Sequence, residues 1–371
     1  MQQLLHAGVD VSAAEDWDII DLFQQKRDGS LEFKTALEIT LEAGHTDALK
    51  VLLDHGGAVR AQLLEILGDG RLLQTPATGG DIQMLEMLLE YIPLDQRCDR
   101  GYSVWGAVVS GAVVSGKTQI VGFFLDREWE FIEPLHAAAD SGHTEVAKLL
   151  LERGIIEEID ARSERWHGMA ALDLAARAGK VDLIELLMEK GAELDTSEDG
   201  ITPAHHAAKY GHDDALEFLV QKGADVNAAS DDGTTPIHLA AQFDHYSTLE
   251  LLIRMGGDVN AKDNEGHAAL YHAAKAFDFH APYHVPLRSE DIARTYGVDL
   301  AWLLLQNGAL LDQQDSIGWT AMDAAVRGGR IGMARALLMA RTNGGVENIA
   351  SSVEELYDFL ERIDRDDDWF Y

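Results

Sequence analysis

The sequence predicts an all-α solenoid in which pairs of helices stack one on the next. One pattern occurs twice in almost unchanged form between Asp199 and Asn260, and Thr235 of the second copy follows Thr202 of the first by 33 residues. Each copy holds two segments with apolar residues at helical spacing, separated by a tight turn. A fixed period of this size, with two helices per period, is typical of proteins whose repeats stack on their neighbours.

The first helix of each copy has a recognisable beginning. Thr202 and Thr235 are favourable N-cap residues, and the proline after each suits the first helical position because it has no N–H to lose. His205 and His238 follow each threonine by three residues, where an imidazole can hydrogen-bond back to the capped turn. Gly211 then allows the positive φ that ends the helix. Each copy is therefore predicted to form helix, tight turn, helix and hairpin loop.

The motif Thr-Pro-x-His-x-Ala-Ala-x-x-Gly-His at residues 202–212, followed by a leucine-rich helix and Gly-Ala-Asp-Val-Asn, resembles the ankyrin repeat. The resemblance implies an ankyrin-type helix-turn-helix solenoid with short hairpin loops and a helical C-terminal cap. It also implies a non-catalytic scaffold that binds another protein.

The repeat register divides the chain into four segments. Residues 1–34 are expected to form a partial repeat and an N-terminal capping helix, the helix running from Asp16 to Lys26. Degenerate repeats follow over residues 35–132, and regular repeats over residues 133–340 with an insertion at about 278–296. Residues 341–371 are expected to form an acidic cap helix and tail. The partial repeat at the start is either a degenerate half-repeat or a sign that the chain is a fragment of a longer one.

Most repeats have a glycine at the position that closes the first helix, which we call the glycine slot. Two repeats have Asp244 or Phe277 at this position instead. The glycines of this slot are Gly44, Gly80, Gly116, Gly142, Gly179, Gly211 and Gly329.

Composition restricts the class of partner. The chain has 30 lysines and arginines against 64 aspartates and glutamates, a formal net charge of −34, which disfavours nucleic acid and anionic membranes as partners. The charge indicates either a basic partner segment or simply a soluble, elongated surface. With Cys98 as the single cysteine and no apparent signal peptide or membrane span, a cytoplasmic or nuclear location is expected. The oligomeric state stays open.

No catalytic residue, cofactor or metal site is expected from the sequence. Asp278, His280 and His284 in the insertion are a weak set of zinc ligands, because no rigid spacing holds them. Gly111 to Thr118 matches the phosphate-binding loop pattern Gly-x4-Gly-Lys-Thr, so a nucleotide-binding protein is the alternative function. That loop needs a preceding strand, which Val104 to Val109 would have to supply. A recognition module of a larger enzyme or ubiquitin-ligase assembly is a further alternative.

In ankyrin repeats, partners usually meet the hairpin tips and the exposed end of each first helix, which together form the concave surface. The resemblance places the tips at Trp166, His167, Glu198, Asp199, Ile201, Asp231, Asp232, Thr234, Asn264, Glu265 and His267, and the first-helix positions at Lys209, Tyr210, Gln242 and Phe243. Aromatic rings beside carboxylates suit a basic or amphipathic segment. The alternative is that Tyr210 and Phe243 only pack on each other between repeats.

Overall fold

The structure is a computed structural model. It describes residues 22–25, 31–34, 40, 44–54, 79, 81–91, 104–127, 131–156, 158–194, 199–275, 298–328 and 330–341. The chain divides into two compact units, residues 1–157 and residues 158–371, and each is described by itself.

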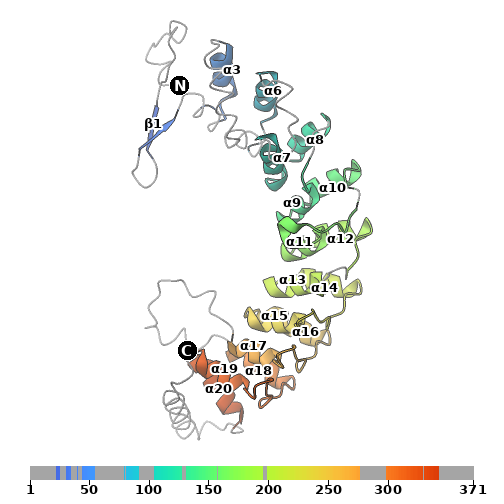
Figure 1. Ribbon diagram of the computed structural model, residues 1–371, viewed down its shortest axis with the longest axis vertical. Coiled ribbons are helices and arrows are strands. Elements are labelled where there is room, and N and C mark those ends of the chain that lie inside the picture. Colours follow the sequence, from blue (N-terminus) through green and yellow to red (C-terminus); the bar gives the residue numbers. More distant parts are fainter. Residues whose placement is uncertain are drawn as a thin grey trace. The chain divides into compact units, whose positions relative to one another are not determined.

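The second unit is built from stacked helix pairs (Figure 1). The pairs are α11 (Ala171–Arg177) with α12 (Val181–Glu189), α13 (Pro203–Tyr210) with α14 (Asp213–Gln221), α15 (Pro236–Gln242) with α16 (Tyr246–Arg254), α17 (Ala269–Lys275) with α18 (Val298–Gln306), and α19 (Ala321–Arg327) with α20 (Ile331–Arg341). The first helices pack in one row, α11 on α13, α13 on α15, α15 on α17 and α17 on α19, and the second helices pack in a parallel row from α12 to α20.

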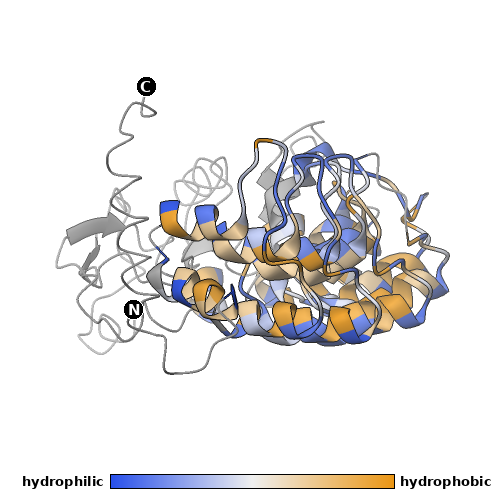
Figure 2. Ribbon diagram, turned by 90° about the horizontal axis from the view of Figure 1, so that it is seen from below, coloured by the Kyte–Doolittle hydropathy of each residue, from blue (hydrophilic) through white to orange (hydrophobic). Residues whose placement is uncertain are grey.

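The core of this unit lies between the two rows of helices. The first helices contribute small side chains such as Ala207 and Ala240, and the second helices contribute leucines such as Leu216 and Leu249, all with no exposed surface. Small residues let neighbouring first helices approach closely, while leucines fill the space beneath them. In Figure 2 the hydrophobic residues concentrate on the helices, and the loops that join the pairs are mostly hydrophilic.

The glycine slot has the backbone conformation that the sequence predicts. Among the described members, Gly44, Gly116, Gly142, Gly179 and Gly211 have φ between 67° and 72°, and Asp244 has φ 61°. The slot is also crowded. A Cβ on Gly211 would lie 2.6 Å from Nδ1 of His245, whose Nε2 donates to the Lys209 carbonyl at 2.9 Å. Thus the glycine both ends its helix and makes room for the histidine of the next repeat.

The first unit contains a hairpin of two strands, β1 (Leu22–Gln25) and β2 (Leu31–Lys34), and a series of helices. The helices are α3 (Thr46–Asp54), α6 (Ile82–Tyr91), α7 (Val104–Val114), α8 (Thr118–Leu125), α9 (Pro134–Asp140) and α10 (Thr144–Glu152). Of these, α3 packs on α6, α7 packs on both α8 and α9, and α10 contacts α8 and α9.

The predicted capping helix from Asp16 to Lys26 is wrong where the structure describes it. Residues 22–25 form β1, which pairs antiparallel with β2 so that Phe23 stands opposite Phe33. The sequence between the strands contains Asp28-Gly29, a dipeptide that favours tight hairpin turns. The helix was inferred from apolar spacing over a short segment, where helix and strand patterns are hard to separate. Apart from this hairpin, the elements of the described residues are helices, as the all-α prediction expects.

The segment before the phosphate-loop pattern is helical. Residues 104–114 form α7 despite their glycine, valine and serine content, because Val109, Ala112 and Val113 are at most 1% exposed and tertiary packing outweighs propensity. Gly116 has φ 70° and closes this helix as in the other repeats. The nucleotide-binding alternative therefore loses the strand on which it depended.

Several sequence-based predictions lie outside the described residues. These are the partial repeat at the start, Gly80, Phe277 and Gly329 of the glycine slot, the insertion at 278–296 with Asp278, His280 and His284, and the cap beyond Arg341. Within the part of the chain that the structure does describe, no helix has the length and apolar character needed to cross a membrane.

Candidate binding surface

The hairpin tips of the second unit form a row held by main-chain hydrogen bonds. The N–H of Asp231 donates to the Asp199 carbonyl, and the N–H of Asn264 donates to the Asp232 carbonyl, both at 2.9 Å. The N–H of Ser316 donates to the Glu265 carbonyl at the same distance. Because each tip bonds to the next one, neighbouring tips stand at a fixed spacing along the stack.

A second row of contacts joins the turns that follow the second helices of neighbouring repeats. The Asn227 side chain accepts from the N–H of Asp258 at 2.8 Å and donates to the Gly256 carbonyl at 3.1 Å. Asn260 makes the equivalent contacts with Leu310 and Gly308. The asparagine that ends each Asp-Val-Asn segment therefore joins its repeat to the next one.

The predicted acidic tips are exposed. Asp199, Asp231, Asp232, Asn264 and Glu265 all lie on the surface, so four carboxylates stand along the row. Asp232 Oδ1 accepts from the Ser230 hydroxyl at 2.5 Å and from the Thr234 N–H at 3.0 Å. The Ser230 hydrogen bond holds the pKa of Asp232 below its ordinary value. The Asp232 carboxylate thus holds its own hairpin in shape by these hydrogen bonds and also adds negative charge to the surface.

The remaining predicted tip residues differ in exposure. His167 is exposed in a left-handed conformation with φ 54°, while Trp166, Ile201 and Thr234 are half-buried. The guanidinium carbon of Arg165 lies 5.1 Å from the centre of the Trp166 ring. Glu198 lies outside the described residues.

The predicted first-helix residues gather around one lysine. The Lys209 Nζ lies 5.8 Å from the centre of the Tyr210 ring and 5.3 Å from that of Phe243, so one cation reaches rings of two adjacent repeats. Tyr210 is 45% exposed, whereas Phe243 and Gln242 are half-buried. The Tyr210 ring also stacks on His212, with ring centres 6.5 Å apart. This group therefore joins adjacent repeats and presents aromatic surface at the same time.

His267 is a correction to the predicted surface, because this residue is only 7% exposed. Its ring stacks on Tyr271, with ring centres 3.8 Å apart, and lies among three carboxylates. Nδ1 is 3.3 Å from Asp263 Oδ2 and 3.2 Å from Glu265 Oε2, and Nε2 is 3.3 Å from Asp315 Oδ2. Tertiary packing between two hairpins encloses a residue that its sequence position marks as exposed.

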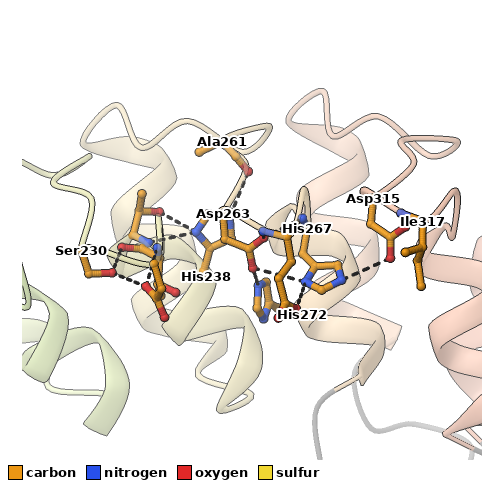
Figure 3. A network of polar contacts seen from close by, with 12 residues as sticks. Ser230, His238, Ala261, Asp263, His267, His272, Asp315 and Ile317 are labelled. Carbon is orange, nitrogen blue, oxygen red and sulfur yellow. Dashed lines mark hydrogen bonds and ion pairs between the residues drawn. The ribbon is translucent and has the colours of Figure 1, made fainter.

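His267 belongs to a polar cluster that also contains Asp263 and His272 (Figure 3). Nε2 of His272 lies 2.9 Å from Asp263 Oδ2. Burial of Asp263 opposes its charge, yet the hydrogen bonds from His272 and from the His267 backbone hold the pKa of this carboxyl below its ordinary value. The sequence-based site missed Asp263, His272 and Asp315.

A sequence signal for this cluster does exist. At the positions of Thr235 and His238, the next repeat has Ala268 and Tyr271, so it lacks the residues that cap the first helix. It gains His267 and His272 at positions held by Thr234 and Leu239.

Comparison with known families agrees with the repeat register. The family model described as "Ankyrin repeats (3 copies)" matches residues 109–198 and residues 195–263. No match to a curated protein was found. Ankyrin repeats are generally modules for protein–protein interaction, and the family is typically non-catalytic. The match, the helix pairs and the hydrogen-bonded row of hairpins agree, and residues 109–263 of the chain are therefore ankyrin repeats.

Proposed function

We propose that this protein is a scaffold that binds a basic or amphipathic segment of another protein through the tips and first helices from Trp166 to Glu265. The observation that carries the proposal is the row of exposed carboxylates at Asp199, Asp231, Asp232 and Glu265, held in line by hydrogen bonds between tips. A fixed row of like charges attracts a segment of opposite charge and orients it before contact.

The rings of Tyr210 and Phe243 are the proposed anchors. Tyr210 is exposed and Phe243 is half-buried, so both rings have surface left for a partner to cover. Aromatic side chains dominate the binding energy of many interfaces, because they bury a large area with little loss of conformational freedom. Lys209 between the rings favours a segment whose own acidic or polar group faces this point, while its basic groups face the tips. An amphipathic segment, with both kinds of group, fits this arrangement better than a uniformly basic one.

The experiment selects binding peptides from a display library of basic and amphipathic segments and measures their association rates at low and high salt. Reversing the charge of Asp231, whose carboxylate is exposed, should slow association several-fold at low salt and change it little at high salt. Glu217→Lys is the matched control, since Glu217 is exposed on α14 away from the tips. Equal effects of the two changes, or selected peptides without basic residues, would contradict the proposed surface.

A second pair of variants separates anchors from packing residues. Tyr210→Ala and Phe243→Ala should each weaken peptide binding by about 1–3 kcal/mol, mainly through faster dissociation. Thermal unfolding of the free variants provides the control. If the changes lower the melting temperature and leave the dissociation rate unaltered, the rings only join adjacent repeats.

A further inference from the structure

The cluster around His267 contains donors of the kinds that bind transition metals. Asp263, His267 and His272 each direct one donor atom into a space where all three atoms lie within 4.8 Å of one another. Glu265 Oε2 stands beside them, 3.2 Å from His267 Nδ1. Imidazole nitrogen and carboxylate oxygen are both common ligands of Zn²⁺ in proteins.

The histidines of this cluster differ from those of the repeat motif. In His205 and His238, Nδ1 accepts the N–H of the capping threonine and Nε2 donates to a carbonyl, so both nitrogens are used within the fold. The donor nitrogens Nδ1 of His267 and Nε2 of His272 face carboxylate oxygens instead. These two nitrogens can therefore offer lone pairs to a cation placed among the same carboxylates.

The spacing of the donors suits tetrahedral coordination. Zinc–ligand bonds of roughly 2.0–2.1 Å separate neighbouring ligand atoms of a tetrahedron by about 3.3 Å. Asp263 Oδ2 lies 3.3 Å from His267 Nδ1 and 2.9 Å from His272 Nε2. Glu265 Oε2 lies 3.2 Å from His267 Nδ1, so three donor pairs are close to the separations of a four-coordinate site. The donor atoms of Asp263, His267 and His272 lie within 4.8 Å of one another, so a small shift of the side chains completes the arrangement.

Surrounding groups hold the ligands in place. Asp263 Oδ1 accepts the backbone N–H groups of Glu265 and His267 at 3.0 Å and 2.8 Å, leaving Oδ2 directed at the imidazoles. His267 Nε2 faces Asp315 Oδ2, and Asp315 Oδ1 is fixed by the N–H groups of Ile317 and Trp319. A carboxylate behind a ligating histidine orients the ring and strengthens it as a ligand.

Exposure leaves one side of the cluster open. The side chains of Asp263 and His267 are each 8% exposed and that of Asp315 is 2% exposed, whereas Glu265 is 74% exposed. An ion can therefore enter from the Glu265 side, and the other ligands form a buried base.

We propose that Asp263, His267 and His272 bind one Zn²⁺ ion, with Glu265 as the fourth ligand and Asp315 as the positioning carboxylate behind His267. The site goes beyond peptide binding. Its four ligands belong to one repeat, where they replace the threonine–histidine cap that this repeat lacks, and Asp315 links the site to the next hairpin. The bound ion stabilises the folded chain, because the unfolded chain does not hold these ligands together.

The experiment titrates tag-free, chelator-treated protein with Zn²⁺ by calorimetry near neutral pH. It is repeated with His272→Gln and with Asp263→Asn, which keeps an oxygen for the two backbone N–H groups. The parent should bind one ion at this site, with a rise in melting temperature, and each variant should bind it at least tenfold more weakly. Asp315→Asn should weaken it by about 10–100-fold, as expected for a carboxylate that orients a ligand.

Because the chain has 15 histidines, His167→Asn serves as the matched control and should bind Zn²⁺ as the parent does. Cobalt substitution gives a second readout, since tetrahedral Co²⁺ absorbs strongly in the visible region and the His272→Gln protein should lack this absorption. Circular dichroism without metal checks that the variants fold. Zinc binding that is absent from the parent, or equal in His272→Gln and His167→Asn, would overturn the proposal. So would the absence of cobalt absorption from the parent protein.

Discussion

The two regular repeats between Asp199 and Asn260 and the repeat that follows them begin their first helices differently. In the regular repeats, the N–H of Thr202 or Thr235 donates to Nδ1 of the histidine three residues later, at 3.1 Å and 3.0 Å. Nε2 of the same ring donates to the Thr234 or Ala261 carbonyl. The next repeat has Ala268 and Tyr271 at these positions and cannot make this cap.

In other repeats an aspartate takes the place of the histidine three residues after the N-cap. Asp173 accepts the N–H of Ala170 at 2.9 Å, and Asp323 accepts the N–H and hydroxyl of Thr320 at 2.8 Å and 2.7 Å. The repeat with Tyr271 is therefore a true exception among the described repeats of the second unit. A histidine whose two ring nitrogens both form hydrogen bonds within the fold has no lone pair left for a metal ion. The candidate metal ligands therefore lie in the repeat that lacks the threonine–histidine cap.

The largest effect is expected at the glycine slot of a regular repeat. Gly211→Ala should destabilise the protein by about 2–4 kcal/mol, as measured by urea unfolding. The left-handed backbone, with φ 72°, costs about 1–2 kcal/mol for a residue with a Cβ. The rest comes from displacing His245, which leaves the Lys209 carbonyl without its hydrogen bond.

Gly168→Ala is the matched control for this change. Gly168 has nearly the same φ, 75°, but a Cβ there would meet no atom within 4 Å. This variant should cost only the backbone strain of about 1–2 kcal/mol. Equal losses at Gly211 and Gly168 would show that the contact with His245 contributes nothing to stability.

The next effect compares a motif histidine with a cluster histidine. His238→Ala should destabilise the protein by about 2–3 kcal/mol, because it leaves the Thr235 N–H and the Ala261 carbonyl without these partners in a buried region. His272→Ala in the presence of a chelator should cost about 1 kcal/mol, since it removes one hydrogen bond to Asp263. Urea unfolding in chelator measures both losses. A larger loss of stability in His272→Ala than in His238→Ala would contradict the difference between the two repeats.

The smallest effect is a dependence of stability on pH. Burial, aided by the neighbouring imidazoles, lowers the pKa of His206 and of His238 to about 4. Between about pH 4 and 6.5 the unfolded chain binds a proton at each residue that the folded chain does not, so stability falls as the pH falls. Burial raises the pKa of Asp173 to about 6, which acts in the opposite direction between about pH 4 and 6.

Summed over His206, His238 and Asp173, the unfolded chain binds about one proton more than the folded chain between about pH 5 and 6. The parent protein should therefore lose about 1.4 kcal/mol when the pH falls from about 6 to 5 in chelator, as measured by urea unfolding. In His238→Ala the remaining two groups nearly cancel, and its stability should be almost constant over this interval. A parent whose stability does not change, or a variant that changes as much as the parent, would rule out His238 as the source.

The sequence by itself determined the repeat register, the helix pairs and the start of each regular first helix. These features depend on local chemistry, namely threonine and proline at the helix start, an acceptor three residues later, and positive φ at glycines such as Gly211. The exposed row at Asp199, Asp231 and Glu265 also followed from the register, because equivalent positions of stacked repeats lie side by side.

Tertiary structure alone decided the features that depend on residues distant in the chain. The crowding of Gly211 comes from His245 of the next repeat, and the burial of His267 comes from Asp315 of a hairpin 48 residues further along the sequence. The strand at Leu22–Gln25 exists because it has a pairing partner at Leu31–Lys34, which apolar spacing within one segment cannot reveal. Packing between repeats places these groups together, and no periodicity within a single repeat records it.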